Sequence, residues 1–307
     1  MILTITPNPL LDYVIHCPQP PLPGAHRVKT LNTTVGGKGI NVARMLKTLG
    51  KPALALGFCG GTSGEKVKAI LADQGIIGRF VQTDAETRTG INLVIENPHS
   101  QTWWIEDGED LKNDEVYAFF DLLKDYLPKA RFLALSGTIP GNSHRDFYKR
   151  ILEFCKGVNC ETYLDAHGEP LIHAMEVGGF FLKHNRDESI SSLGLDPFNE
   201  NERRKWLAKL EQKKLTGAMV TDGPGKVLLW GDEGVSLLSP PEVREVSSIG
   251  SGDASLAGFI FARCEGKSVL EAARWAISAG SADATRPGPC EAEYKEVEKY
   301  LPRVRRL

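Results

Sequence analysis

Apolar residues along the chain fall into short compact runs, separated by longer stretches with helical spacing. The compact runs have the length of β-strands and lie at residues 2–5, 53–58, 132–135, 162–164, 180–183 and 218–220. Between the first two runs, Val42, Met45, Leu46 and Leu49 recur at the spacing of one helix face. Because strands and helices alternate, the pattern predicts an α/β fold in which helices cover both faces of a mostly parallel sheet.

Helix boundaries are predicted from capping signals. Segments 62–65 and 268–271 both have a hydroxyl residue followed three positions later by glutamate, the spacing of a capping box. The first is expected to open a helix that runs to residue 73. A further helix is expected over residues 143–155, and the chain from residue 253 onward is predicted to be mostly helical.

Two stretches break this rhythm and predict a small second sheet. Residues 13–35 are rich in proline and have no helical period, whereas residues 89–106 alternate between apolar and polar positions around a turn at Asn97 and Pro98. We expect these insertions to form a β-sheet lid on the edge of the main domain. No linker divides the chain, so residues 1–307 are interpreted as one domain.

Composition and charge exclude several classes of function. The 307 residues are 41% hydrophobic with a net charge of −2, so no positive field favours nucleic acid or an anionic membrane as a partner. The six cysteines form no C-x-x-C pair, as expected of a cytoplasmic protein in a reducing compartment. The first residues resemble a strand more than a signal peptide, and no apolar stretch approaches about 20 residues.

The strongest chemical signal is the segment SIGSGDASLAGF at residues 248–259. Gly250, Ser251 and Gly252 let successive N–H groups point into one concavity, and the N-terminus of the following helix adds a positive dipole end. This arrangement is typical of a phosphate site. Asp253 beside it is therefore a candidate base that accepts a proton from an attacking hydroxyl. The alternative is a tight loop followed by an ordinary N-terminal aspartate.

Two other phosphate motifs are excluded. A dinucleotide-binding fingerprint requires glycine where Ser255 stands, and it belongs near the start of the chain. A P-loop ending at residues 266–268 would require glycine in place of Phe261.

A second glycine-rich helix entry, GGKGINVARML, lies at residues 36–46. Gly37 gives the backbone room, and the Lys38 ammonium and the Asn41 amide suit an anionic or polyhydroxylated ligand. The alternative is a glycine-rich turn that carries a solvated lysine.

Three further residues are candidate substrate ligands. Asp12 follows the first strand, where ligands of open α/β sheets bind, and is a candidate for sugar hydroxyls. Arg27 and Arg88 fall on the predicted lid, and they gain a functional role only if the lid folds over Lys38.

Together the two motifs resemble the signatures of the ribokinase-like (PfkB) carbohydrate kinases, specifically the phosphofructokinase branch. The resemblance implies a three-layer α/β/α sandwich with a β-sheet lid. Further segments are similar to family motifs in the same order: ILTITPNPLLD at the start, ETR (86–88), LSGTIPG (135–141), LDAHGEPL (164–171), LKHNRDE (182–188), VTDGPGK (220–226) and AGSADATRPG (279–288).

The resemblance also implies roles and ligands. Asp253 would be the base, Asp12 and Asn41 would orient the sugar, and the cationic Arg27, Lys38 and Arg88 would neutralise the substrate's own phosphate. ATP, Mg²⁺ near Glu188 and, in this family, K⁺ are the implied cofactors. The residues implied to contact the nucleotide are Lys183, Asn185, Thr221, Gly223, Gly225 and Ser281.

The sequence departs from the family pattern at several positions. His184 replaces a proline, the second signature reads GSGDA, Asp222 stands where a neutral residue is frequent, and Glu106 and Asp107 replace a proline-glycine turn. The last change concerns the lid, which faces the sugar.

The substrate therefore stays open at this point. Fructose 1-phosphate, tagatose 6-phosphate and fructose 6-phosphate are alternatives, followed by an unphosphorylated sugar or a nucleoside. A non-catalytic sugar- or nucleotide-binding regulator is a different class, which the intact Asp253 disfavours, and an NAD-dependent oxidoreductase is disfavoured by the misplaced glycines. The exposed strand edge of the lid predicts a homodimer through the lid.

Overall fold

The computed structural model describes residues 1–27, 31–97 and 100–307. Its main sheet has ten strands in the order β14-β13-β12-β11-β10-β9-β8-β1-β4-β5. Every pairing from β5 to β11 is parallel, and β12 to β14 add an antiparallel edge. The strands are β1 (Ile2–Thr6), β4 (Leu54–Gly60), β5 (Ile77–Thr83), β8 (Phe132–Ser136), β9 (Glu161–Asp165), β10 (Phe181–Asn185), β11 (Gly217–Thr221), β12 (Val227–Gly231), β13 (Gly234–Ser239) and β14 (Arg305–Arg306).

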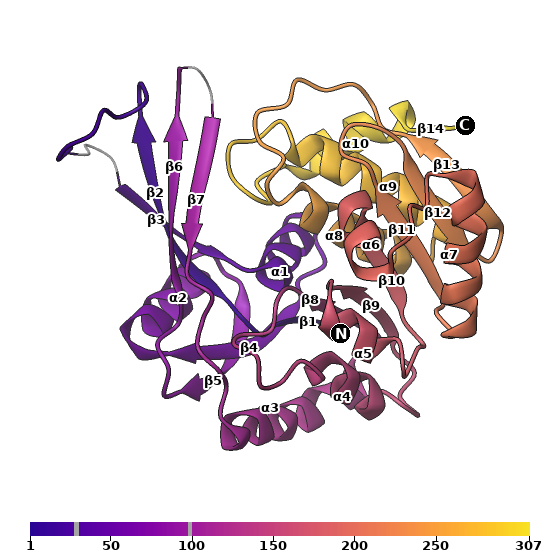
Figure 1. Cartoon of the computed structure of the whole chain (residues 1–307), viewed down its shortest axis with the longest axis horizontal. Helices are drawn as coiled ribbons and strands as arrows, with labels where there is room; N and C mark the ends of the chain where they lie inside the picture. The colour runs from indigo at the N-terminus through magenta and orange to yellow at the C-terminus, as the bar shows by residue number, and fades with distance from the viewer. Residues whose placement is uncertain (28–30, 98–99) are drawn as a thin grey trace.

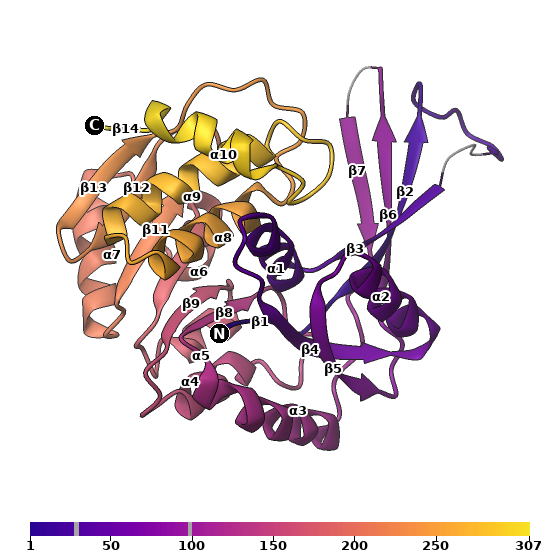
Figure 2. The same ribbon diagram turned by 180° about the vertical axis from the view of Figure 1, so that it is seen from behind.

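Helices cover both faces of this sheet, so the predicted three-layer α/β/α architecture is confirmed (Figures 1 and 2). Two separate apolar cores lie between the helices and the sheet, one on each face. The first core is formed with α1 (Lys38–Thr48), α2 (Gly61–Asp73), α8 (Ser251–Cys264), α9 (Val269–Asp283) and α10 (Tyr294–Tyr300). The second is formed with α3 (Asn113–Tyr126), α4 (Phe147–Phe154), α5 (Glu169–Ala174), α6 (Arg186–Leu193) and α7 (Glu200–Gln212).

The two insertions form a separate four-stranded sheet that stands beside the main body (Figure 1). Its strands, in the order β3-β2-β6-β7, are β3 (Leu31–Gly36), β2 (Leu10–Cys17), β6 (Thr89–Ile95) and β7 (Ser100–Ile105). The antiparallel pairing of β6 with β7 confirms the predicted hairpin. Pro98 of the predicted turn lies outside the described residues.

The capping predictions had different outcomes. Ser268 and Glu271 form the expected capping box at the start of α9. The prediction for Thr62 was wrong, because α2 already begins at Gly61 with Gly60 as its N-cap. A carboxylate from outside the helix instead accepts a hydrogen bond from a free N–H group of its first turn. Glu86 Oε1 accepts the Ser63 N–H at 2.6 Å.

Helix α4 begins four residues later than expected, at Phe147. The N–H groups of Asn142 and Ser143 donate to Asp110 Oδ1, so this segment forms a turn before the helix starts. Within the described ranges, no helix is both long and apolar enough to cross a membrane.

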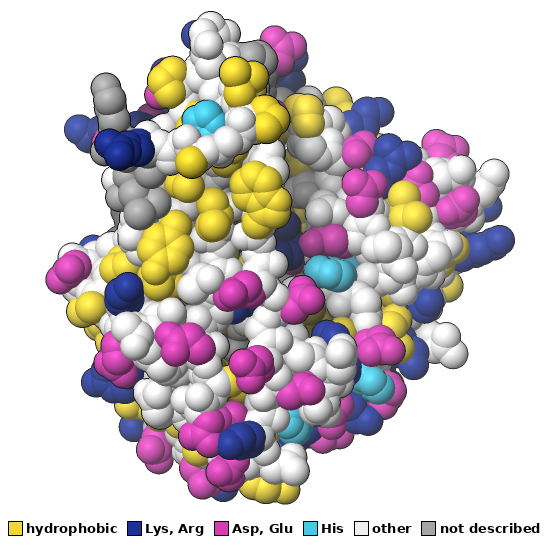
Figure 3. Space-filling view, turned by 60° about the vertical axis from the view of Figure 1, so that its left-hand side comes forward, with side chains coloured by type: hydrophobic (Ala, Val, Ile, Leu, Met, Phe, Trp, Pro, Cys, Tyr) yellow, Lys and Arg dark blue, Asp and Glu magenta, His cyan; other side chains and the backbone are white. Residues whose placement is uncertain are grey.

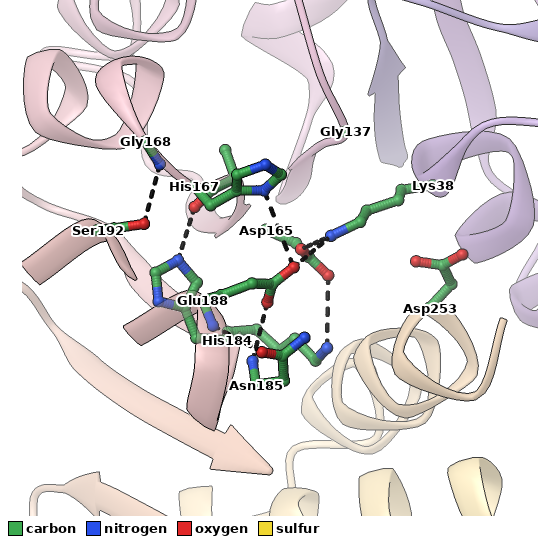
Figure 4. A network of polar contacts seen from close by, with 12 residues as sticks. Lys38, Gly137, Asp165, His167, Gly168, His184, Asn185, Glu188, Ser192 and Asp253 are labelled. Atoms are coloured by element: carbon green, nitrogen blue, oxygen red, sulfur yellow. Dashed lines mark hydrogen bonds and ion pairs between the residues drawn. The ribbon is translucent and has the colours of Figure 1, made fainter. Parts of the chain in front are cut away.

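The topology fixes where a site can form. Because β1, β8, β9, β10 and β11 run parallel, their carboxyl ends meet at one edge of the sheet. Helices α1, α6 and α8 begin close to this edge, as the close view in Figure 4 shows.

Candidate active site

A buried carboxylate, Asp165, lies at the centre of the site (Figure 4). It is the last residue of β9 and is only 1% exposed. Its Oδ1 accepts a hydrogen bond from Lys38 Nζ at 2.6 Å, and its Oδ2 lies 3.6 Å from Lys183 Nζ. Burial alone would raise the pKa of Asp165, but the two ammonium groups outweigh it and hold that pKa well below its usual range.

Lys38 joins Asp165 to a second carboxylate. It is the first residue of α1, and its Nζ also donates to Glu188 Oε1 at 3.1 Å. Burial acts to lower the pKa of Lys38, but the facing carboxylates raise it well above its ordinary value, so the ammonium stays charged. Gly37 precedes it with φ 124°, and a β-carbon there would come within 2.6 Å of Thr6 Cγ2. Only glycine therefore lets α1 start this close to β1.

Glu188 is held by the first turn of α6. Its Oε2 accepts the Asn185 N–H at 2.9 Å, and Asn185 Oδ1 accepts the Glu188 N–H, which together form a capping box. Burial and the Asp165 charge act to raise the pKa of Glu188, but Lys38 and Lys183 reverse this and lower it. The side chain is therefore an ionised carboxylate beside the cluster.

The described residues fit a hydrated Mg²⁺ rather than a dedicated metal cage. No group of three or more acidic, histidine or cysteine side chains in the described ranges could hold a metal ion. Two neighbouring carboxylates are nevertheless present, and Asp165 Oδ2 is buried without a hydrogen-bond partner there. Mg²⁺ commonly keeps several waters and binds through one or two carboxylates plus substrate phosphates. Asp165 and Glu188 match that donor set.

Asp253 lies in the first turn of α8 and is 7% exposed. Burial, followed by the nearby Asp165 charge, raises the pKa of Asp253 to about 7, although Lys38, Lys183 and a hydrogen bond from Asn41 oppose the rise. A carboxylate whose pKa lies near neutrality is well matched to proton abstraction.

The glycines before Asp253 have separate structural reasons. Gly250 has φ 82°, and a β-carbon there would lie 2.4 Å from Pro289 Cβ. At Gly252 a β-carbon would lie 2.7 Å from Lys183 Nζ. The Ser251 N–H closes a turn onto Ser248 O at 3.2 Å. The N–H groups of Gly250 and Gly252 make no hydrogen bond within the described part of the chain and are available to an anion.

Asn41 and Arg44 lie next to Asp253 on α1. Asn41 Nδ2 donates to Asp253 Oδ2 at 2.8 Å, and Arg44 Nη1 donates to Asn41 Oδ1 at 2.6 Å. The sequence predicted Asn41 as a sugar ligand; the structure places both ends of its amide on protein groups. Arg44 was not predicted as a site residue.

The lid holds Asp12 in a partly satisfied environment. Trp103 Nε1 donates to Asp12 Oδ2 at 3.2 Å, whereas Oδ1 is buried and accepts no hydrogen bond from the described residues. Burial raises the pKa of Asp12. A buried unpaired acceptor is costly, so Oδ1 is suited to a hydroxyl donor from a ligand.

The structure does not bring the three predicted cationic groups into one contact. The Arg88 guanidinium donates to main-chain oxygens of Asn8 at 3.0 Å and Glu106 at 3.2 Å, at the base of the lid. Arg27 is exposed on the connection between β2 and β3. Lys38 is engaged by carboxylates, as described above.

The predicted nucleotide residues follow the next strands of the sheet. Asn185 and Thr221 pair in register at the ends of β10 and β11. Gly223 and Gly225 lie in the exposed turn after β11. Ser281 is half-buried on α9, which packs against α8, and makes no hydrogen bond to the lysine–carboxylate cluster within the described ranges.

The side chain of His184 connects β9 and β10 beyond the last pair of residues in their register. Their register ends at Leu182 and Leu164, and two residues further on His184 Nε2 donates to Ala166 O at 2.6 Å. Burial lowers the pKa of His184, so it is a neutral donor there. The side chain therefore joins the two strands next to Asp165 (Figure 4), whose carboxylate lies 3.6 Å from Lys183 Nζ.

Sequence reasoning missed Asp165 and Trp103 as site residues. The signal for Asp165 was present, because an acid at the carboxyl end of a buried parallel strand points to the ligand edge. Trp103 carried no comparable signal, since its contact depends on the register of the lid.

This arrangement can bind and transfer a phosphoryl group. It combines a base near neutral pKa, free N–H groups at a helix N-terminus, two lysines and two carboxylates at one sheet edge. Figure 3 shows the surface hollowed between the lid and the main body, with acidic and histidine side chains beside the hollow.

Comparisons with known proteins agree with this chemistry. The model for the "pfkB family carbohydrate kinase" matches residues 8–295. A curated relative, 1-phosphofructokinase of Bacillus subtilis, is 30% identical over 305 residues, which is 99% of both chains.

Solved structures give the same result. Phosphofructokinase-2 from Escherichia coli, solved in complex with potassium, is 25% identical with a TM-score of 0.91, and its complex with fructose-6-phosphate gives 0.89. Both comparisons cover 98% of each chain. Arabidopsis thaliana ribokinase, complexed with ribose and ATP, is 21% identical with a TM-score of 0.76 over 97% of this chain and 98% of that one, and shows the shared fold.

Proposed function

The chain belongs to the pfkB family of carbohydrate kinases and is an ATP-dependent phosphosugar kinase, and we propose that its acceptor is fructose 1-phosphate. The observation that carries the proposed chemistry is the position of Asp253, a buried carboxyl with a pKa of about 7 at the N-terminus of α8. The choice of fructose 1-phosphate is supported by the Bacillus subtilis relative, which is a 1-phosphofructokinase and is 30% identical.

In the proposed reaction Asp253 accepts the proton of a primary sugar hydroxyl. The hydroxyl oxygen then attacks the γ-phosphorus of ATP, and ADP leaves. The free N–H groups of Gly250 and Gly252 and the ammonium of Lys183 would stabilise the charge on the transferring group. Such stabilisation needs no reorganisation at the moment of reaction, because these groups are already in place.

Lys38 and the carboxylates have a charge-balancing role in this proposal. Asp165 and Glu188 would hold a hydrated Mg²⁺ together with the nucleotide phosphates. When bound, Mg²⁺ would neutralise developing charge on those phosphates. Lys38 keeps both carboxylates ionised and in fixed positions, since it contacts each of them. The potassium complex of the Escherichia coli protein supports K⁺ as a further cofactor to be tested.

The sugar would bind between Asp12 and the base. Asp12 Oδ1 would accept a sugar hydroxyl, which would satisfy its empty acceptor. Arg88 would contact the substrate's own phosphate by exchanging one of its carbonyl partners for it, with Arg27 as a further candidate. The nucleotide would lie over Asn185, Thr221 and the turn that follows.

We propose a homodimer formed through the lid. One face of the lid carries a row of apolar side chains across three strands, in which Ile91 lies between Tyr13 and Trp104. Two residues further along the strands, Ile15 lies beside Leu93 on the same face. Ile91 is 43% and Trp104 is 57% exposed, so this face offers apolar surface that a second copy could cover. Figure 3 shows that apolar side chains gather on the lid. A cytoplasmic location is part of the same proposal.

ATP turnover with a panel of sugars tests the substrate. We expect fructose 1-phosphate to give the highest kcat/KM, followed by tagatose 6-phosphate and fructose 6-phosphate, with unphosphorylated fructose and nucleosides far lower. If kcat/KM is higher for fructose 6-phosphate than for fructose 1-phosphate, the proposed substrate is wrong. Fructose 6-phosphate is the second candidate, because the Escherichia coli enzyme has been solved in complex with that sugar. ATP binding without turnover on any sugar would favour a regulator.

A further inference from the structure

The side-chain amide of Asn41 is engaged at both ends. Its Nδ2 donates to Asp253 Oδ2 at 2.8 Å, and its Oδ1 accepts from Arg44 Nη1 at 2.6 Å. A guanidinium has only donors, whereas an ionised carboxylate has only acceptors. The amide therefore fits between them in one orientation, because a rotation by 180° would set donor against donor and acceptor against acceptor.

Arg44 is itself held from other elements. Its Nη2 donates to Val35 O at 2.8 Å, and its Nη2 and Nε donate to Gln74 Oε1 at 3.2 and 3.3 Å. Val35 belongs to β3, and Gln74 is the C-cap of α2. Arg44 follows Asn41 by three residues on α1, so the two side chains share one helix face. The guanidinium is thus fixed before it meets the amide.

We propose that Arg44 is a positioning residue for phosphoryl transfer, which fixes the Asn41 amide so that its NH₂ group always faces Asp253. This inference rests on the proposed function, in which Asp253 is the base. Arg44 contacts Asp253 only through Asn41, since no hydrogen bond or ion pair joins the two directly among the described residues. Beyond this contact, only the longer-range charge of the guanidinium acts on Asp253. The oriented NH₂ stabilises the ionised base at Oδ2. Oδ1 accepts no hydrogen bond from the described chain and is left for the substrate hydroxyl.

The electrostatic setting of Asp253 determines the sign of the expected effect. Burial and Asp165 raise its pKa to about 7, whereas the Asn41 hydrogen bond lowers it. Loss of the oriented donor must therefore move the pKa further upward. The charged or titratable groups that face Asp253 from the surrounding elements are Lys38 and Arg44 on α1, Asp165 on β9, Lys183 on β10 and Cys290 after α9.

The test follows Asp253 directly and does not need a known substrate. The ¹³Cγ signal of Asp253 in aspartate-labelled full-length protein, assigned by its loss in Asp253→Asn, is titrated in the wild type and in Arg44→Met. We expect the titration midpoint to rise by about one pH unit in Arg44→Met, the size expected for one lost hydrogen bond to a charged group. The rising limb of kcat/KM against pH should move by the same amount, with the KM for ATP unchanged.

Two further variants make the result specific. Lys47→Met is the matched control, because Lys47 lies one turn further along α1 and donates to the main chain of Gln74 but not to Asn41. It should leave the Asp253 midpoint unchanged. Asn41→Leu removes the donor itself and should raise the midpoint. Adding Arg44→Met to it should cause a clearly smaller rise than Arg44→Met causes alone, because the two changes share one interaction and only the longer-range charge of Arg44 is still to be lost.

The outcomes separate this inference from the proposed function. An unmoved Asp253 midpoint in Arg44→Met, or additive shifts in the double variant, would overturn the role of Arg44. If Arg44→Met does not fold, an unmoved midpoint in Asn41→Leu overturns the inference equally. A raised midpoint in a protein that phosphorylates no sugar would leave the positioning role intact and contradict the proposed function instead.

Discussion

The ammonium group of Lys183 lies 2.7 Å from the point where a β-carbon on Gly252 would stand. The lysine therefore occupies the space that a side chain at position 252 would need, next to the turn that we propose binds phosphate. The neighbouring atom is the end of a flexible side chain, so an added methyl group would displace the lysine more easily than the backbone.

This relationship predicts that Gly252→Ala separates activity from stability. Alanine is favourable in the first turn of a helix, so the unfolding midpoint should change little. We expect kcat/KM for ATP to fall at least about tenfold, because one preorganised cation would leave the phosphate site. Steady-state kinetics and thermal unfolding measure the two effects. Gly258→Ala, on the same helix, cannot serve as the control, because its β-carbon would collide with the α9 backbone and destabilise the fold. Normal kinetics in Gly252→Ala would remove Lys183 from the phosphate site.

Asp253→Asn should abolish proton abstraction and leave binding intact. We expect kcat to fall by at least about 100-fold, the lower range for a positioned base. Isothermal titration should show unchanged or tighter ATP binding, since the substitution removes a negative charge near the phosphates. Turnover within a few-fold of the wild type would mean that another group takes the proton.

The raised pKa of Asp253 also predicts a pH dependence of stability. The carboxyl has a pKa of about 7 in the folded protein, above its ordinary value of 3.8, so folding favours the protonated form. Its contribution is fully present below pH 3.8 and is lost as the pH rises through 7. Relative to the wild type, Asp253→Asn should therefore gain about 2–3 kcal/mol in free energy of unfolding between pH 5 and pH 8. Urea unfolding of both proteins at the two pH values measures this difference, and a constant difference would contradict the raised pKa.

Glu188→Gln should weaken the response to magnesium. If Glu188 helps to hold hydrated Mg²⁺, the Mg²⁺ concentration for half-maximal rate should rise about tenfold or more, with the KM for the sugar unchanged. Glu176→Gln is a suitable control, because Glu176 is exposed and pairs with Lys149 on the surface. Equal magnesium curves for the wild type and Glu188→Gln would exclude Glu188 from the metal site.

The apolar face of the lid predicts that Trp104→Glu gives a monomer. A charge at this 57% exposed position on the edge strand β7, beside Ile91, should prevent a second copy from covering the face. Sedimentation velocity would then show the mass of one chain, 33.7 kDa, for the variant and twice that mass for the wild type. Tyr117→Glu, which changes an exposed aromatic on α3 at a distance from the lid, should remain dimeric (Figure 1). A wild-type monomer would rule out the lid dimer.

The central strands could be predicted from the sequence because they are buried on both faces. The strands β1, β4, β8, β9, β10 and β11 are buried at every position or at all but one, and each contains an apolar run, as expected of a parallel sheet covered by helices. The edge strands were missed. β5 alternates between exposed and half-buried positions and even exposes Ile77, so its local pattern resembles a polar loop.

Helices with few buried positions were missed for a similar reason. Helix α7 buries only Trp206 and Leu210, so its apolar period is too sparse to stand out. Helix α3 differs from α7, because Val116, Phe119, Phe120 and Leu123 have helical spacing and its position can be predicted from the sequence.

The site was predictable where a motif is local and was incomplete where it depends on distant pairing. Gly250 to Asp253 form one continuous turn, so their proximity follows from the sequence alone. The contact of Arg44 with Asn41 lies within one helix. Its proposed role depends on Asp253, however, and Asp253 contacts the Asn41 amide only because α8 packs against α1. No single segment contained that information.

The hydrogen bond between Asn41 and Asp253 joins positions 212 residues apart. Lys38 similarly reaches Asp165 and Glu188 across 127 and 150 residues. During synthesis the first signature therefore emerges long before its partners, and the partly made chain has no assembled machinery with which to consume ATP. The site is therefore complete only once α8 has been synthesised and has packed against α1.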